Sequence, residues 1–378
     1  MNIKKQITVA EVKTQNDLRD FIHLPWIIYR NDPYWVPPLI SDLKETLSTD
    51  KNPFFRHADL KLFIARRDNI TVGRVAAIID YNYCKYHNKS VAFFGFFETI
   101  NDFTVAEALL HQVCEYAQNK GMKEIYGPAN PSLNDEAGFL IEGFNSPPCI
   151  KMSYNPPYYL EFVEKFGFQK IKDLYSFYID LTMQPPEKLL RVVNAIKSRK
   201  EIMVRPVNLK KLKDDLIKIK EIYNNAWSNN WDFAPMTDEE IDYLARKLKP
   251  IVVPEIVQIA EIAGEPAGMS IGLPDYNQIL KHLNGRLFPF GFIKFIIYRN
   301  KIDGARLWAL GVKNKFRNIG LDALLYYETF IGGIKKGYKW GDVGWVLEDN
   351  YSIINPILLW DAKLYKKYRI YHLSLSLR

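Results

Sequence analysis

The same order of predicted strands and helices occurs twice along the chain. In the first half, a strand pair at residues 60–80 precedes the apolar strand VAFFGFFE and a long helix. In the second half, a strand pair at 257–273 precedes the strand ARLWALGV (305–312) and another long helix. Strands and helices mixed in this way predict an α/β class, here α+β units each built on a mixed sheet, and the approximate duplication predicts two of them. We therefore expect tandem domains at residues 1–182 and 183–378.

Two helix starts have the pattern of a capping box, in which side chains satisfy the free amides of the first turn. Thr14 and Asp17 precede the helix that carries Leu18 and Phe21. Thr104 and Glu107 have the same spacing before a helix with Leu109 on its apolar face. Both boxes predict where these helices begin.

Composition supports a folded, basic protein. The 378 residues are 48% hydrophobic and 14% aromatic, which suits packed cores, and the net charge is +8. A basic surface fits phosphates, nucleic acid or an anionic membrane without choosing among them. Cys84, Cys114 and Cys149 form no CxxC pair, so we expect neither a disulfide framework nor a metal site. The N-terminus has no apolar signal region, which predicts a cytoplasmic protein.

The most apolar stretch is LFPFGFIKFIIY, at residues 287–298. It is too short to span a membrane, since a span needs about 20 residues, and it carries Lys294. Taken alone, it reads slightly better as a buried helix or strand. The alternative is an interfacial or acyl-facing element with basic residues at headgroup level. That reading predicts peripheral contact at the inner face of the membrane.

The stretch KNKFRNIGLDALL (313–325) joins a predicted strand to a predicted helix. Backbone amides of such a loop and of the helix start form an anion site, and Gly320 would let a phosphate approach closely. Arg317 could add a charge-assisted hydrogen bond. A plain basic turn has the same composition, so the loop alone does not decide between the two.

The run Val312, Arg317, Gly320 and Leu321, placed between a strand and a long helix, resembles the acetyl-CoA motif of the GNAT acyltransferase superfamily. The later signature of that superfamily appears in the first half as YYLEFVEKFGF, with Lys165, Gly167 and Phe168. The resemblance covers most of the chain and implies two tandem GNAT-like domains. In the first half, FGFFET is followed by INDFTVAEALL, which has no arginine and no glycine. The resemblance therefore also implies that only the second domain binds the cofactor.

The resemblance assigns roles to residues of the second half. The backbone of the motif strand would pair with the pantetheine arm of acyl-CoA, and the loop and helix start would hold its pyrophosphate. The residues so implied are Leu310, Gly311, Val312, Lys315, Arg317, Asn318, Ile319, Gly320, Leu321 and Asp322. Asp322 departs from the pattern, which usually has glycine or alanine at this position. A carboxylate there would repel phosphates unless it points away from them, as we expect. Ile357 stands about where many members have a tyrosine as general acid.

Acylation of an amine needs a proton acceptor and an oxyanion donor. Glu348 is the first candidate for the base and Asn350 for an orienting or oxyanion group, both just beyond a strand. A polar strand end with a helix cap explains the pair equally well. Glu98, at the end of the strand VAFFGFFE, is a further candidate base, although a solvated charge is the simpler reading.

An acceptor cleft is expected in the first domain, where polar residues gather in irregular segments that turn chemistry alone would also favour. The apolar insertion of the second half adds two aromatic residues. The candidates are Asn130, Asn134, Glu136 (also as a catalytic residue), Tyr154, Tyr158, Phe288 and Phe290.

Stretches such as DPYWVPPL, GPANPSLNDEAGFLIEGF and WVLEDN look like a bacterial GNAT-like family that includes bacterial ceramide synthase. This resemblance implies an N-acyltransferase that uses acetyl-CoA or long-chain acyl-CoA as co-substrate, without a metal. The acceptor would be a small-molecule or lipid amine, such as a sphingoid base. The alternatives are an aminoacyl-tRNA-dependent transferase, which the Arg317–Gly320 loop disfavours together with other nucleic-acid partners, and a non-catalytic binding protein.

Overall fold

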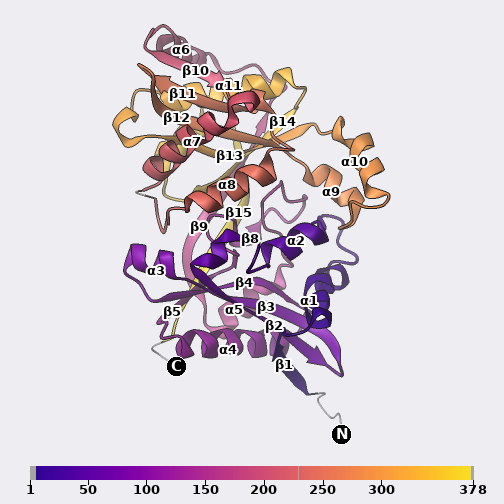
Figure 1. Ribbon diagram of the computed structural model, residues 1–378. Coiled ribbons are helices and arrows are strands. Elements are labelled where there is room, and N and C mark those ends of the chain that lie inside the picture. The colour runs from indigo at the N-terminus through magenta and orange to yellow at the C-terminus, as the bar shows by residue number, and fades with distance from the viewer. Residues whose placement is uncertain (1–5, 229, 376–378) are drawn as a thin grey trace. The chain divides into compact units, whose positions relative to one another are not determined.

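The computed structural model describes residues 6–228 and 230–375. The chain divides into two compact units (Figure 1). The first unit contains Met1–Asp173, Leu280–Phe295 and Tyr368–Arg378, and the second contains Leu174–Ile279 and Ile296–Lys367. Relative to a division at 182/183, the first unit thus includes two segments of the second half. Strands β9 (Gln169–Asp180) and β15 (Lys363–Ser374) each contribute residues to both units.

In the first unit the strand order is β1 (Ile7–Glu11), β2 (Ala58–Arg67), β3 (Ile70–Asp80), β4 (Val91–Thr99), β5 (Glu124–Gly127) and β15. Strands β1 to β4 pair antiparallel, whereas β4 and β5 pair parallel. Helix α4 (Phe103–Asn119) makes the crossover that a parallel pair requires. Its apolar face, with Leu109, packs in one core with the sheet and α5 (Tyr158–Phe166).

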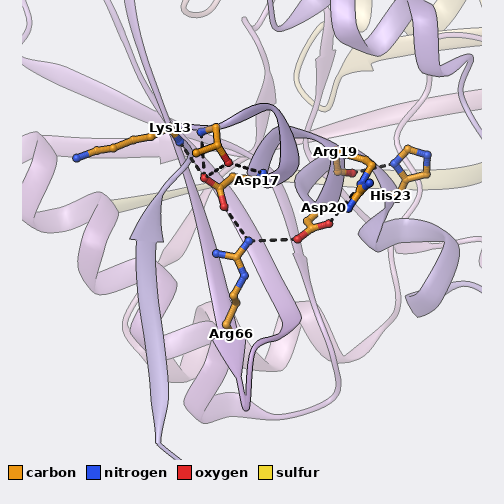
Figure 2. Close-up of polar contacts among 7 residues, drawn as sticks. Lys13, Asp17, Arg19, Asp20, His23 and Arg66 are labelled. Carbon is orange, nitrogen blue, oxygen red and sulfur yellow. Dashed lines mark hydrogen bonds and ion pairs between the residues drawn. The ribbon is translucent and has the colours of Figure 1, made fainter.

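Helix α1 (Gln15–Ile28) begins at the predicted capping box, which is confirmed. The Asp17 amide donates to Thr14 Oγ1 at 3.1 Å, and the Thr14 amide donates to the Asp17 carboxylate at 3.0 Å. Figure 2 shows Arg66 of β2 donating to both Asp17 and Asp20, at 2.8 and 3.2 Å. The Arg66 hydrogen bond, followed by those from Thr14, holds the pKa of Asp17 well below its usual range. The start of α1 is thereby tied to the sheet.

The second predicted capping box is wrong. Helix α4 begins one residue before Thr104, and its N-cap is Asp102, whose carboxylate accepts from the Thr104 amide at 3.0 Å. Arg67 donates to the same carboxylate at 2.6 Å. Aspartate is as good an N-cap as threonine, and here Arg67 of the neighbouring strand favours it.

The second unit repeats the plan, which confirms the predicted mixed α/β class. Its order is β10 (Ile202–Pro206), β11 (Val257–Ile262), β12 (Glu265–Pro274), β13 (Gly304–Val312), β14 (Trp340–Leu347) and β9. Strands β10 to β13 pair antiparallel, and β13 pairs parallel with β14 through the crossover helix α11 (Leu321–Lys335). Helix α11 packs with α6 (Glu187–Lys197), whereas α7 (Leu212–Ala226) and α8 (Asp238–Leu248) lie together.

Shorter elements complete the chain. They are α2 (Ile40–Thr46), α3 (Tyr81–His87), β6 (Ala129–Asn130), β7 (Glu136–Ala137), β8 (Phe139–Glu142), α9 (Asn277–Leu283), α10 (Gly291–Arg299) and α12 (Tyr351–Leu358). Within the described residues, no helix is both long and apolar enough to cross a membrane.

The apolar stretch 287–298 forms α10 and the loop before it, and the prediction that it is buried is wrong. Phe288 and Phe290 are 72% and 74% exposed, and Phe292, Ile293, Ile296 and Ile297 are also exposed. Periodicity alone could not show this, because a short apolar run reads alike whether protein covers it or not.

Candidate functional site

The motif strand β13 has a free edge. It pairs with β14 only from Gly304 opposite Trp340 to Leu307 opposite Val343, although it pairs with β12 as far as Val312. In the described part of the chain, the β14-facing edge of residues 308–312 therefore has no strand partner. An extended ligand can hydrogen-bond to such an edge as another strand would. The structure thus places Leu310, Gly311 and Val312 where an extended arm can pair with them.

The loop after β13 leads to the N-terminus of α11. It contains a short 3-10 turn, Asn314–Phe316, then Arg317 and Asn318, which has a positive φ of 63°. Gly320 is the N-cap, with a φ of 84°, and no side chain of the described chain caps this end. A Cβ at Gly320 would lie 2.6 Å from Ile196 Cδ1 on α6, so both conformation and packing require glycine here. The uncapped amides of a 15-residue helix make an anion site.

The basic residues of this loop hold it to the rest of the unit. Arg317 donates to the Ala226 carbonyl oxygen, at the end of α7, at 2.6 Å. Lys313 pairs with Glu221 and Glu265, and Lys315 pairs with Glu265 at 2.6 Å. Arg317 therefore braces the loop in this structure, a role that its sequence position did not reveal.

Asp322 lies in the first turn of α11 and is largely shielded from solvent. Burial raises the pKa of its carboxyl, and the adjacent amides of Ala323 and of Asp322 itself oppose the rise. Its charge acts further on Tyr326, one turn on, whose pKa is raised mainly by burial.

The corresponding edge in the first unit is closed by the protein itself. Strand β4 pairs with β5 only as far as Phe93 opposite Tyr126. Beyond that point the Phe96 amide donates to Asn130 Oδ1 at 2.6 Å, and a Cβ on Gly95 would lie 1.8 Å from the Ala129 carbonyl oxygen. Strand β6 thus fills the position that is open beside β13. The N-terminus of α4 is closed as well, by the Asp102 cap.

Glu98 lies at the centre of a buried polar cluster in the first unit. Tyr159 Oη and Tyr29 Oη donate to its carboxylate at 2.8 and 3.0 Å, and Arg74 lies 3.6 Å away. Burial raises the pKa of Glu98, and Arg74 opposes the rise. The simpler expectation, a solvated strand-end charge, is wrong. Sequence reasoning missed Tyr29, Arg74 and Tyr159, because only the fold brings them to Glu98.

A hollow of about 540 Å³ opens in the first unit beside the end of α1. Tyr154 lines it and donates to Asp32 Oδ2 at 2.9 Å. Asp32 Oδ1 also accepts from the Tyr34 amide at 2.8 Å, so the carboxylate is held at the wall of the hollow. Its other lining residues are Ile27, Ile28, Arg30, Asn31, Pro33, Phe144 and Pro157. Sequence reasoning found Tyr154 but missed Asp32, because in the sequence Asp32 looks like an ordinary turn residue.

The other predicted residues of the first unit lie on separate elements. Tyr158, on α5, donates to the Thr99 carbonyl oxygen at 2.8 Å. Glu136 of β7 lies opposite Asn130 of β6, and the Asn134 amide donates to Ser132 Oγ within the connecting loop. Phe288 and Phe290 are on the surface and do not line the hollow beside α1.

Glu348 and Asn350 follow β14 in the second unit. Glu348 is half-buried directly after the strand, and Asn350 is the N-cap position of α12. Asn350 Oδ1 accepts from Ser352 Oγ, in the first turn of α12, at 2.7 Å, but its side chain makes no cap hydrogen bond to a helix amide. Ile357 is completely buried in α12, as a core residue.

Comparisons with known proteins agree with this geometry. The chain matches a tandem GNAT protein from the clavulanic acid biosynthesis pathway with a TM-score of 0.61, at 11% identity, over 98% of this chain and 99% of that one. The protein therefore has the tandem GNAT fold.

Two proteins of similar sequence define the family to which the chain belongs. The chain is 34% identical to Protein YghO of Escherichia coli (strain K12), covering 98% of this chain and 96% of the relative. It is 32% identical to Bacterial ceramide synthase of Caulobacter vibrioides (strain NA1000 / CB15N), covering 98% of each. The chain belongs to the family that contains these two proteins. No protein-family model matches it.

Proposed function

We propose that this protein transfers a long-chain acyl group from acyl-CoA to the primary amine of a lipid, such as a sphingoid base. The observation that carries the proposal is the free edge of β13 leading into the uncapped N-terminus of α11. The name of the Caulobacter relative supports a lipid amine as acceptor. The aminoacyl-tRNA alternative is disfavoured by a helix N-terminus that suits a compact phosphate group.

The second unit would bind the CoA. Leu310, Gly311 and Val312 pair with the pantetheine arm, and the amides from Asn318 to Asp322 hold the pyrophosphate, with Lys315 nearby. In the transfer, the amine nitrogen attacks the thioester carbon, a C–N bond forms, and the C–S bond breaks to release the CoA thiolate. A base must accept the ammonium proton first, and half-buried Glu348 is our candidate, with Asn350 orienting.

An assay for both products tests the proposal. Purified protein is incubated with palmitoyl-CoA and sphinganine. The released CoA thiol is measured with a thiol-reactive chromogenic reagent, and the amide product is measured by mass spectrometry. We expect thiol and amide in equal amounts. Thiol without amide, or amide formed only from charged tRNA, would contradict the proposed reaction.

The exposed hairpin of α9 and α10 suits contact with an anionic membrane, which would place the protein at the cytoplasmic face. Six large apolar side chains are exposed at its tip and on α10. Between residues 276 and 302 the charged residues are Lys281, Arg286, Lys294, Arg299 and Lys301, and no acidic residue occurs. Basic side chains at headgroup level beside buried aromatics are typical of interfacial helices.

Replacing Phe288, Phe290 and Ile293 together by serine should reduce membrane binding at least about tenfold, because each buried large side chain contributes about 1.5–3 kcal/mol. Flotation with vesicles containing one quarter phosphatidylglycerol measures it. Ile70→Ser, which removes a residue 65% exposed elsewhere, is the matched control and should float like the parent. Equal flotation of the triple variant would show that the hairpin is not the contact.

Two single substitutions test the loop. Arg317→Ala should weaken CoA binding about tenfold, because a charged hydrogen bond that braces the loop is lost. Asp322→Ala should leave CoA affinity nearly unchanged or raise it, because it removes a negative charge next to the proposed phosphate site. Calorimetric titration with CoA measures both. A large loss of affinity in Asp322→Ala would mean that the carboxylate contributes to the site.

A further inference from the structure

An apolar cavity of about 90 Å³ lies in the second unit, under helices α7 and α8. Its floor is formed by strands β11, β12 and β13, where Met269 and Val257 are buried. Its walls are almost entirely aliphatic, with Leu212, Leu216, Ile219, Ile241, Leu244 and Leu248 among them. An apolar cavity of this order stays dry and accepts apolar ligands.

The charged side chains beside the cavity do not place a free charge in its interior. Of its described lining residues, only Lys220 and Lys249 are charged. Lys249 is exposed, and Lys220 pairs with Asp242 at 3.1 Å and Asp238 at 3.4 Å. A ligand with polar groups would lose hydrogen bonds on entering such a space, whereas a hydrocarbon chain would lose none.

The cover of the cavity is lightly held. Of the residues of α8, all of which the structure describes, just Ile241 is buried. The two aspartates that tie α8 to Lys220 of α7 have side chains that are 80% and 60% exposed, and exposed ion pairs contribute little. The helix can therefore move away from the sheet at small cost, which gives room for a chain longer than the resting cavity holds.

The cavity adjoins the motif strand where the thioester would end. Trp308 and Ala309 of β13 line it, and the next residue, Leu310, begins the pantetheine-pairing stretch. A pantetheine arm that starts at the Gly320 amides and follows the edge of β13 runs backward from Val312 to Leu310. Since an extended strand advances about 3.3 Å per residue, the thioester then reaches Ala309, at the wall of the cavity.

We propose that this cavity is the acyl-chain site: the hydrocarbon of the acyl-CoA lies between α7, α8 and the sheet. The inference rests on the proposed function. It adds the place in the second unit where the length of the acyl chain is recognised. Met236 and Met269, at the wall and floor, suit chains of varied shape because methionine adapts its side chain readily.

Calorimetric titration with CoA, acetyl-CoA, octanoyl-CoA and palmitoyl-CoA tests the site. In the parent protein, affinity should rise by about fourfold for each methylene until the cavity is filled. Ala245→Phe places a large side chain in the cavity from α8. The increase in affinity from acetyl-CoA to octanoyl-CoA should therefore be at least tenfold smaller in this variant, whereas its affinity for CoA should be unchanged. Arg246→Phe, on the exposed face of the same helix, is the matched control and should keep the gain.

A second variant guards against a folding defect in the first. Leu216→Ala enlarges the cavity from α7 and should shift the preferred acyl chain to greater length. If the gain with chain length is the same in the parent, Ala245→Phe and Leu216→Ala, the acyl chain lies elsewhere and the proposal is overturned. If neither CoA nor any of its thioesters binds to the parent protein, the proposed function itself fails. That result differs from binding in which affinity does not depend on chain length.

Discussion

Gly320→Ala should raise the dissociation constant for CoA by at least about tenfold, because a left-handed backbone costs a non-glycine residue roughly 1–2 kcal/mol. The new Cβ would also lie 2.6 Å from Ile196 Cδ1. Either the loop or α6 must shift, and the amides at the start of α11 then lose their common direction. Calorimetric titration with CoA measures the effect.

Gly337→Ala is the matched control. Gly337 follows the other end of α11, with a φ of 86°, and a Cβ there would meet nothing within 4 Å. Both substitutions carry the same backbone cost, so melting temperatures should fall in both variants. Only Gly320→Ala should lose CoA. If the two variants bind CoA alike, the start of α11 is not the phosphate site.

Asp342→Ala should lower the free energy of unfolding by about 3–5 kcal/mol, the usual cost of removing one partner from a buried ion pair. Asp342 of β14 is 0% exposed, and Arg306, opposite it on β13, is 2% exposed, with 3.7 Å between the charged groups. Ser176 Oγ donates to the carboxylate at 2.5 Å, and Tyr365 donates to it as well. The substitution would leave the buried guanidinium without its counter-charge and two hydroxyls without this acceptor. Urea denaturation measures the loss.

The double variant Arg306→Met, Asp342→Leu separates the pair from the space it fills. Replacing both charges by apolar side chains of similar volume is often nearly neutral, so it should be more stable than Asp342→Ala. A loss below about 1 kcal/mol in Asp342→Ala would contradict the account, since it would place the pair in the range of exposed ion pairs.

The repeated order of elements and the strand–loop–helix motif were predictable from the sequence because they depend on local periodicity and on single glycines. Gly320 illustrates this, since its positive φ is a local requirement. Contacts between distant segments were not predictable. The Tyr29 and Tyr159 hydroxyls meet Glu98 across 69 and 61 residues of chain, and the Arg317 guanidinium reaches Ala226 across 91. No pattern near any of these residues signals its partner.

Two further misjudgements have one cause, the neighbourhood that the chain acquires on folding. The N-cap of α4 is Asp102 rather than Thr104, and Arg67 of β2 pairs with that carboxylate. Residues 287–298 look like core, yet six of their large side chains are exposed because no described segment covers them. In the candidate site, the free edge of β13 and the filled edge of β4 arise from register, which sequence propensity does not fix.

Hydrogen–deuterium exchange with and without CoA tests the central claim most directly, because it locates the ligand. We predict that CoA slows exchange at residues 308–312 and at 318–324, the strand edge and helix start, and leaves residues 94–106 of the first unit unchanged. Protection at residues 94–106, or CoA binding without any protection at 308–312 and 318–324, would contradict the assignment of acyl-CoA to the second unit.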